Sequence, residues 1–546
     1  MVVSAQALAS QVGVEVLRAG GNVVDAAVAV GYALAVVYPA AGNLGGGGFM
    51  TIRFADSRTT FLDFREKAPL AATPDMFLGP DGAVIPGLST DSWKAVAVPG
   101  SVAGLEAARE RYGSRPRAEL IAPALALARD GFALTPGDAT LIALVAPSLA
   151  RDPAARAVFL PDGRPPRAGD VLRQPDLART LERIAADGAP AVYGGPIGDA
   201  IVQAGADGGG VLAAEDFRRY AVREMRPVTC SYRGLVVHSA PPPSSGGVAL
   251  CEILAIVEGY PLDAYGFRSA AEVNVLSESM RAAFRDRNDA LGDPAFVDNP
   301  VARLTDKGYA ASLRNAIAIG RAGPPSAAPD AERPQTTHYS VADAAGNAVA
   351  VTTTLNGWFG ARRIAGATGI VMNNEMDDFT AKPGVPNMFG LVQGQNNAVA
   401  PGKTPLSSMA PTIVTRDGRL ALVLGSPGGS RIITVVAETL VNMADHGMSL
   451  AEAVDAPRFH MQGQPDVLAV EPFGLSPDTA AVLTGEGYSV RTQAPWGMVA
   501  AIAAGSRRLR PRQDEGHALA LQPDAPGAAL FGAMDVRSPT GLAAGY

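Results

Sequence analysis

Apolar residues recur at helical spacing in two segments at the start of the chain. In residues 4–19, Ser4 can cap the first turn and Gly20-Gly21 can end the helix. Residues 23–38 are more apolar, follow Asn22 as a second cap, and are shorter than the roughly 20 residues that span a membrane. We therefore expect two helices, the second of them buried inside the protein.

Segments rich in β-branched and aromatic residues predict strands next to glycine-rich loops. Residues 49–54 and 59–64 follow the loop of residues 42–48, and residues 235–239 precede the Pro/Ser/Gly-rich residues 241–247. The first loop has no Lys-Ser/Thr after it and precedes a strand, so we interpret it as a close-packed turn and not as a nucleotide site. We interpret residues 241–247 as a rigid connector to a helix that begins near Val248.

The second half of the chain also alternates between predicted strands and loops. Residues 336–342 and 348–355 are β-rich and joined by a short turn, which predicts a hairpin. Residues 420–424 predict a strand, residues 425–430 a glycine-rich loop, and residues 432–444 a helix with apolar residues at helical spacing. Residues 321–334 are rich in Pro, Ala and charge, and we expect them to be exposed.

Composition places the chain among globular proteins. Its 546 residues are 47% hydrophobic and 18% charged. A net charge of −7 and the lack of a long Lys/Arg run argue against a nucleic-acid partner. Cys230 and Cys251 could form one bridge or none, and they do not predict a zinc site. No basic segment followed by an apolar one precedes Ser4, so we expect no export signal within this sequence.

Thr336 stands at the first position of the predicted hairpin, directly after the exposed segment. A threonine hydroxyl needs a base, and an α-amino group with a pKa of about 7.7 suits that task near neutral pH. A free N-terminal threonine supplies both groups, provided that the bond from Gln335 to Thr336 is first broken. A threonine that merely starts a strand would look the same in isolation.

The loop of residues 425–430 lies between a predicted strand and a predicted helix. Backbone N–H groups in such a place can bind a phosphate or the oxyanion of a tetrahedral intermediate. Phosphate loops of this kind bring a lysine, which is missing here, so the oxyanion interpretation is favoured.

Several separated motifs, in order along nearly the whole chain, resemble the γ-glutamyltranspeptidase family. The motifs are Gly20-Gly21-Asn22, Gly42 to Phe49, Asp63-Phe64-Arg65-Glu66, Pro241 to Gly247, Gln335 to Val341, Thr354-Leu355-Asn356, Asn373 to Phe379, Pro405 to Met409 and Gly425 to Ser430. The resemblance implies a four-layer αββα sandwich of the N-terminal nucleophile (Ntn) hydrolase type. It also implies self-cleavage into a large subunit, residues 1–335, and a small subunit, residues 336–546, which together form a heterodimer.

The same resemblance implies a role for each matched residue. Thr336 is the nucleophile, with its α-amino group as the base, and Thr354 orients it. Gly428 and Gly429 supply the oxyanion N–H groups. The γ-glutamyl group carries a carboxylate and an ammonium on one carbon, so opposite charges are needed. Arg65, Ser407 and Ser408 are expected to bind the carboxylate, and Asn356, Glu375 and Asp378 the ammonium.

The resemblance further implies γ-glutamyl donors such as glutathione, with water, amino acids or peptides as acceptors. It implies no cofactor and no metal, and a periplasmic or extracellular location. Residues 382–404 suit an active-site lid, and we expect Phe389 and Trp358 on the acceptor side of the pocket. Trp496 is expected to be a core residue.

Two alternatives remain for the function. A glutaryl-cephalosporin acylase would bind an acyl group without the α-ammonium, and the presence of Asn356, Glu375 and Asp378 argues against it. A non-catalytic binding homologue is disfavoured because Thr336, Thr354 and both glycines are present.

Overall fold

Two antiparallel sheets lie face to face at the centre of the molecule. In this computed structural model, residues 1–324, 336–509 and 529–546 are described. The first sheet has the order β18 (Leu542–Ala544), β1 (Val2–Ser4), β9 (Thr337–Ala342), β10 (Ala348–Thr354), β2 (Gly47–Arg53), β3 (Thr59–Phe64) and β6 (Arg223–Met225). The second has the order β17 (Leu530–Met534), β16 (Ala500–Ala504), β12 (Arg419–Gly425), β11 (Thr412–Arg416), β8 (Leu235–Ser239) and β7 (Val228–Tyr232).

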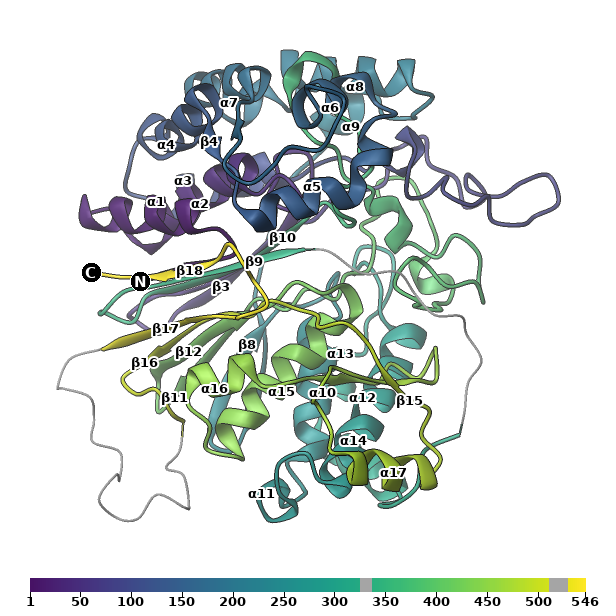
Figure 1. The fold of residues 1–546 in the computed structure, drawn as a ribbon. Coiled ribbons are helices and arrows are strands. Elements are labelled where there is room, and N and C mark those ends of the chain that lie inside the picture. Colours follow the sequence, from purple (N-terminus) through teal and green to yellow (C-terminus); the bar gives the residue numbers. More distant parts are fainter. Residues whose placement is uncertain (325–335, 510–528) are drawn as a thin grey trace.

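Helices cover the outer face of each sheet (Figure 1). Above the first sheet lie α1 (Ala7–Arg18), α2 (Val23–Val37), α3 (Ser101–Tyr112), α4 (Arg117–Asp130), α5 (Pro136–Leu149), α6 (Pro153–Phe159), α7 (Pro175–Asp187), α8 (Pro196–Asp207) and α9 (Ala214–Arg218). Below the second lie α10 (Gly246–Val257), α11 (Leu262–Tyr265), α12 (Ala270–Ala290), α13 (Val301–Leu304), α14 (Lys307–Ala316), α15 (Ile432–Ala444), α16 (Leu450–Asp455) and α17 (Pro477–Gly485). The expected αββα sandwich is confirmed.

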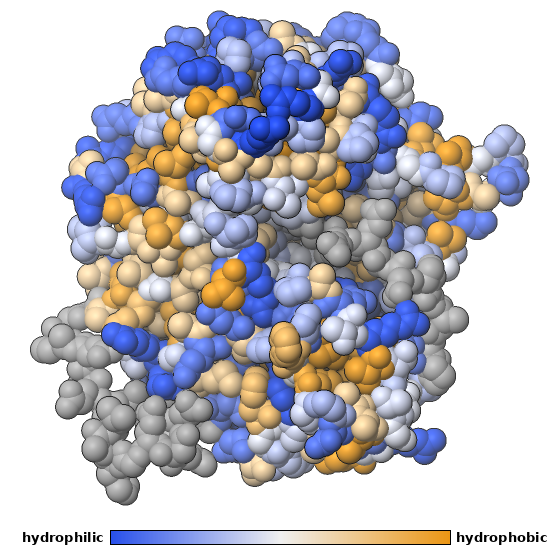
Figure 2. Space-filling model, viewed as in Figure 1, coloured by the Kyte–Doolittle hydropathy of each residue, from blue (hydrophilic) through white to orange (hydrophobic). Residues whose placement is uncertain are grey.

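Each of the three interfaces between layers has its own apolar core. Between the sheets, small and β-branched side chains such as Val3, Ala350, Ile413, Val423 and Ile502 pack together and are fully buried. Larger clusters fill the space between each sheet and its helices. On the face seen in Figure 2, hydrophilic and hydrophobic side chains are interspersed. Because the central strands β2, β9 and β10 are covered on both faces, all of their residues are buried, including polar ones such as His338 and Ser340.

The start of the chain differs from the sequence prediction. Ser4 does not cap the first helix but belongs to β1, where it pairs with Leu542 and Tyr339 on the two neighbouring strands. The side chain of Gln6 caps the helix instead, by accepting a hydrogen bond from the Leu8 N–H at 2.7 Å. The sequence pattern missed this because β1 is only three residues long and is defined by partners from distant parts of the chain.

Other local predictions are confirmed. Asn22 caps the entirely buried helix α2 through a capping box with Asp25. The hairpin of β9 and β10 forms with Thr337 opposite Thr353. The two cysteines, which the sequence left open, form one disulfide that joins β7 to α10. Among the helices of the described ranges, none combines the length and apolar character needed to cross a bilayer.

Candidate active site

The hairpin brings Thr336 and Thr354 together. Its last paired residues are Thr337 and Thr353, so the next residue on each side lies at the open end of the hairpin. There the two hydroxyl oxygens are 3.4 Å apart, and both residues are buried. Thr354 Oγ1 also accepts the Asn356 N–H at 2.8 Å. Thr354 is therefore placed to hold the Thr336 hydroxyl in one orientation.

The glycine loop of residues 42–48 supports this end of the hairpin. Asn43 Nδ2 donates to the Thr354 carbonyl at 2.9 Å, and Asn43 Oδ1 accepts the Gly46 N–H at 2.9 Å. A Cβ added at Gly46 would lie 2.0 Å from the Thr354 carbonyl oxygen. The loop is thus the close-packed turn that the sequence predicted, and its glycines let two backbones meet beside Thr354.

A second glycine loop faces Thr336 from the start of α15. Gly428 and Gly429 have φ angles of +144° and +55°, which favour glycine. They lead into a 3₁₀ turn, Gly429–Arg431, and then into α15. Neither N–H group donates a hydrogen bond within the described part of the chain. Gly429 lines a small cavity together with Thr336 and Thr354, so its N–H can serve a developing oxyanion there.

The other side of the cavity is a cluster of buried charges around Arg65, which follows β3. Its guanidinium donates to Glu375 Oε1 and to Asp378 Oδ2, and it lies 3.7 Å from Glu66. Glu375 and Asp378 sit on a 3₁₀ turn, Glu375–Asp378. Asp378 Oδ1 and Glu375 Oε2 are buried and accept no hydrogen bond from any amide, hydroxyl or guanidinium group of the described residues. These oxygens are available to a cationic ligand.

Burial and mutual proximity shift the pKa of every group in this cluster. Burial raises the pKa of Glu375 and of Asp378, although Arg65 opposes that shift. Burial likewise raises the pKa of Glu66 to about 7. For Arg65, burial by itself would lower the pKa, but the three carboxylates more than offset it, so the pKa is raised and the guanidinium stays charged.

Ser407 and Ser408 line the same cavity and are held by residues from the first half of the chain. Ser245 donates from both its N–H and its hydroxyl to the Ser407 carbonyl, at 2.8 and 2.7 Å. Arg287 on α12 donates to Ser408 Oγ at 3.2 Å. Residues 241–247 therefore do more than connect β8 to α10, because they fix the backbone of the serine pair. Neither this support nor the role of Arg287 was predicted from the sequence.

Some of the remaining predicted residues line this cavity and others do not. Asn356 lines the cavity with a left-handed backbone, φ +76°, and its Nδ2 donates to the Asn374 carbonyl at 3.1 Å. Phe389, on the segment predicted as a lid, also lines it. Trp358 is not among the lining residues; it is partly buried and meets the ring of Tyr38 edge-on. Gln335 lies outside the described residues. Trp496 is buried in the core, as expected.

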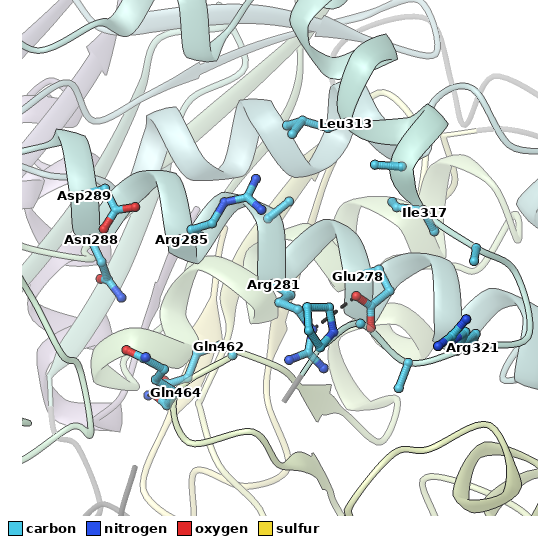
Figure 3. A pocket seen from close by; sticks show the side chains of 17 residues that line it. Glu278, Arg281, Arg285, Asn288, Asp289, Leu313, Ile317, Arg321, Gln462 and Gln464 are labelled. Carbon is cyan, nitrogen blue, oxygen red and sulfur yellow. Dashed lines mark hydrogen bonds and ion pairs between the residues drawn. The ribbon is translucent and has the colours of Figure 1, made fainter. Parts of the chain in front are cut away.

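A larger cavity lies elsewhere in the described part of the chain. It measures about 790 Å³ and is bordered by α12, the segment after α14, and residues 462–464 (Figure 3). Arg281, which extends from α12 into this region, is paired with Glu278 and with Asp466. None of the predicted catalytic residues lines this cavity. The predicted nucleophile, the second glycine loop and the buried charges instead meet at the smaller cavity at Thr336.

A threonine at the open end of a central hairpin, between two facing sheets covered by helices, is the arrangement of the N-terminal nucleophile hydrolases. These are enzymes that cleave amide bonds. Comparison with known sequences narrows this class. The profile of the family described as gamma-glutamyltranspeptidase matches residues 9–518. The chain therefore belongs to the γ-glutamyltranspeptidase family.

Individual relatives agree with this assignment. The glutathione hydrolase proenzyme of Pseudomonas sp. (strain A14) is 52% identical over 551 residues, which covers 100% of this chain and 94% of the relative. That of Escherichia coli (strain K12) is 47% identical over 552 residues, with 100% and 92% covered. Among solved structures, a cephalosporin acylase from Bacillus halodurans superposes with a TM-score of 0.84 at 25% identity, covering 100% of this chain and 95% of that one.

Proposed function

We propose that the protein cleaves γ-glutamyl amide bonds, with glutathione among its donors, and passes the γ-glutamyl group to water or to amino-acid and peptide acceptors. One observation carries the proposal: the Thr336 hydroxyl and the Gly429 loop share a cavity with buried groups of both charges, including unpartnered carboxylate oxygens. A γ-glutamyl group needs this combination, because two methylene groups beyond its reacting carbonyl it has a carbon that bears both a carboxylate and an ammonium.

The first step would be self-cleavage. Thr336 Oγ attacks the Gln335 carbonyl carbon, the acyl group moves from nitrogen to oxygen, and water hydrolyses the ester. The products are residues 1–335 and residues 336–546, with a new α-amino group on Thr336. Because β9 and β10 lie between β1 and β2, one core contains strands from both pieces, which supports a heterodimer that stays together.

In turnover, the α-amino group takes the Thr336 hydroxyl proton as the oxygen attacks the γ-carbonyl carbon. The N–H groups of Gly428 and Gly429 would stabilise the oxyanion of the tetrahedral intermediate. The departing amine takes the proton back, which leaves a γ-glutamyl ester on Thr336. Water or an acceptor amine then attacks this ester, loses its proton to the α-amino group, and releases the product.

Binding of the donor would use the charged side of the cavity. Asp378 and Glu375 have oxygens free for the ammonium, and Asn356 lines the same cavity. Arg65, Ser407 and Ser408 would take the α-carboxylate. In the structure Arg65 is occupied by Glu375 and Asp378, so a donor must share that cation with them or shift it.

Assays of the purified protein with a γ-glutamyl anilide and with a glutaryl anilide test the proposal. We expect the γ-glutamyl substrate to be preferred, and electrophoresis to show two chains divided before Thr336. Preference for the glutaryl substrate would support the acylase alternative, and no turnover of either would support a binding homologue. The disulfide is consistent with the periplasmic or extracellular location that we propose, because such bonds persist in oxidising compartments.

A further inference from the structure

Arg287 is a buried cation that forms no ion pair with a carboxylate of the described residues, although Asp378 acts on its charge from a distance. Its residue is 1% exposed, as is Arg65. Arg65 is in contact with three carboxylates, whereas Arg287 forms no ion pair with any residue of the described ranges. A buried charge without a counter-charge is costly, so a protein retains one only where hydrogen bonds or a ligand compensate it. Arg287 lines the cavity that contains Thr336.

The hydrogen bonds of Arg287 all end on neutral oxygens. Nε donates to Ser245 Oγ at 2.9 Å, and Nη2 donates to Ser408 Oγ at 3.2 Å. Nη1 donates to Asn288 Oδ1 at 2.8 Å and to Gln393 Oε1 at 3.0 Å. One guanidinium thus ties α12 to the serine pair and to the predicted lid segment, and keeps its full positive charge.

The bond to Ser408 has a directional consequence. A hydroxyl group has one proton to donate, and Arg287 can only donate. Ser408 Oγ must therefore accept from Arg287, which leaves its proton free to point into the cavity. At Ser245 the hydroxyl also accepts from Arg287, and its proton goes to the Ser407 carbonyl at 2.7 Å. Arg287 therefore sets the hydroxyl direction of Ser408 and steadies the backbone beside it.

We propose that Arg287 is a positioning residue for the donor's α-carboxylate, acting through Ser408 and supplying the positive charge behind it. This inference rests on the proposed function and adds a cation that the matched motifs did not include. Arg65 already shares its charge among Glu66, Glu375 and Asp378. Unlike Arg65, Arg287 forms no ion pair with a carboxylate of the described residues, so its positive charge can attract an anionic group of the donor. Burial lowers the pKa of Arg287 to about 10, so the guanidinium remains protonated at neutral pH.

The test compares two competitive inhibitors of the mature enzyme that differ only in the α-carboxylate, L-glutamate and 4-aminobutanoate. For Arg287→Gln we expect the inhibition constant of L-glutamate to rise about ten- to hundredfold, the range for a hydrogen bond to a charged group. That of 4-aminobutanoate should change less than about twofold. The KM of a γ-glutamyl anilide should rise more than its kcat falls.

Arg285→Gln is the matched control, because Arg285 lies on the same helix, has a side chain 60% exposed, and borders the larger cavity (Figure 3). It should leave both inhibition constants unchanged. Ser408→Ala combined with Arg287→Gln should weaken L-glutamate less than the product of the two single effects, because the two residues act on one contact.

Equal weakening of both inhibitors, or of neither, would overturn the proposal and leave Arg287 a structural residue. If Arg287→Gln yields no mature enzyme, the two inhibitors are compared on Arg287→Lys instead. Lysine keeps the positive charge but lacks the planar guanidinium that donates to Ser245 and Ser408 at the same time. Selective loss of L-glutamate then supports the proposal and an equal loss overturns it. Failure of the proposed function would be distinct, because the parent enzyme itself would not turn over the γ-glutamyl anilide.

Discussion

The two sides of the cavity at Thr336 are built in different ways. On the nucleophile side, Thr336 and Thr354 are placed by a single hairpin, and the second glycine loop by the strand and helix next to it in the chain. On the charged side, Arg65 and Arg287 come from the first 324 residues and meet Glu375, Asp378 and Ser408 from later ones. Backbone geometry places the proposed nucleophile, whereas long-range ion pairs and hydrogen bonds place the groups proposed to recognise the donor.

We therefore expect the Thr336 side to carry out the reaction and the charged side to select the substrate. The nucleophile side offers a hydroxyl and backbone N–H groups, which suit any acyl group of the right size. The charged side holds buried ions whose retention is costly unless a charged ligand uses them. A relative of this fold can therefore keep the reaction and change its substrate by altering only the charged side.

The largest expected effect comes from removing the nucleophile. Thr336→Ala should remain one chain of 546 residues and lose at least about a thousandfold in kcat/KM, since no hydroxyl is left to acylate. Thr336→Ser should retain part of both self-cleavage and turnover. Electrophoresis and mass spectrometry follow the cleavage. A Thr336→Ala protein that still divides at this bond would refute the nucleophile assignment.

Breaking the charged side should change the choice of substrate and leave the chemistry in place. Asp378→Asn removes the carboxylate expected to meet the ammonium, so kcat/KM for a γ-glutamyl anilide should fall about ten- to hundredfold. A glutaryl anilide lacks the ammonium and should lose much less. Self-cleavage should continue. An equal loss with both anilides would show that Asp378 serves the fold or the chemistry and not recognition of the ammonium.

Stability should also respond to pH in opposite directions through one buried group near each side. On the hairpin that carries Thr336, burial lowers the pKa of His338 from 6.5 to about 3. Between these values the unfolded chain binds more protons, so the free energy of unfolding falls as the pH drops. On the charged side, burial raises the pKa of Glu66 from 4.5 to about 7. There the folded state binds more protons, so the free energy of unfolding falls as the pH rises from 4.5 to 7.

Two neutral substitutions test this contrast. His338→Gln should remove a rise in the free energy of unfolding between pH 3 and 6.5, and Glu66→Gln should remove a fall between pH 4.5 and 7, each of up to about 1.4 kcal/mol per pH unit. Denaturant unfolding at a series of pH values measures both. The assignment is wrong if His338→Gln makes the slope of stability against pH more positive, or if Glu66→Gln makes it more negative.

The smallest effect is expected at the lid. Phe389 lines the cavity and Trp358 does not, so Phe389→Tyr should change the ratio of hydrolysis to transfer by a few-fold, and Trp358→Ala should change it less. Acylation should stay within a few-fold of the parent in both. Measuring both products from one γ-glutamyl donor, with and without an amine acceptor, gives the ratio. An unchanged ratio of hydrolysis to transfer in Phe389→Tyr would show that this ring serves packing and not the choice of acceptor.

The sequence by itself determined the local parts of this protein. The hairpin of β9 and β10, the cap at Asn22 and the close-packed turn of residues 42–48 all follow from short-range periodicity and turn chemistry, and the structure confirms them. The motifs identified the family, and most of the residues proposed for the site do line one cavity. The failure at Ser4 shows the limit of such patterns, because a three-residue strand is decided by its neighbours in the sheet.

Only the tertiary structure decided which charges meet. It paired Arg65 with Glu375 and Asp378, joined Cys230 to Cys251, turned residues 241–247 into a support for Ser407, and brought Arg287 to Ser408. Each of these contacts joins residues far apart in sequence or depends on how separate layers pack. A one-dimensional pattern carries the periodicity of its own element, but the direction of a buried guanidinium is fixed only when every layer around it is in place.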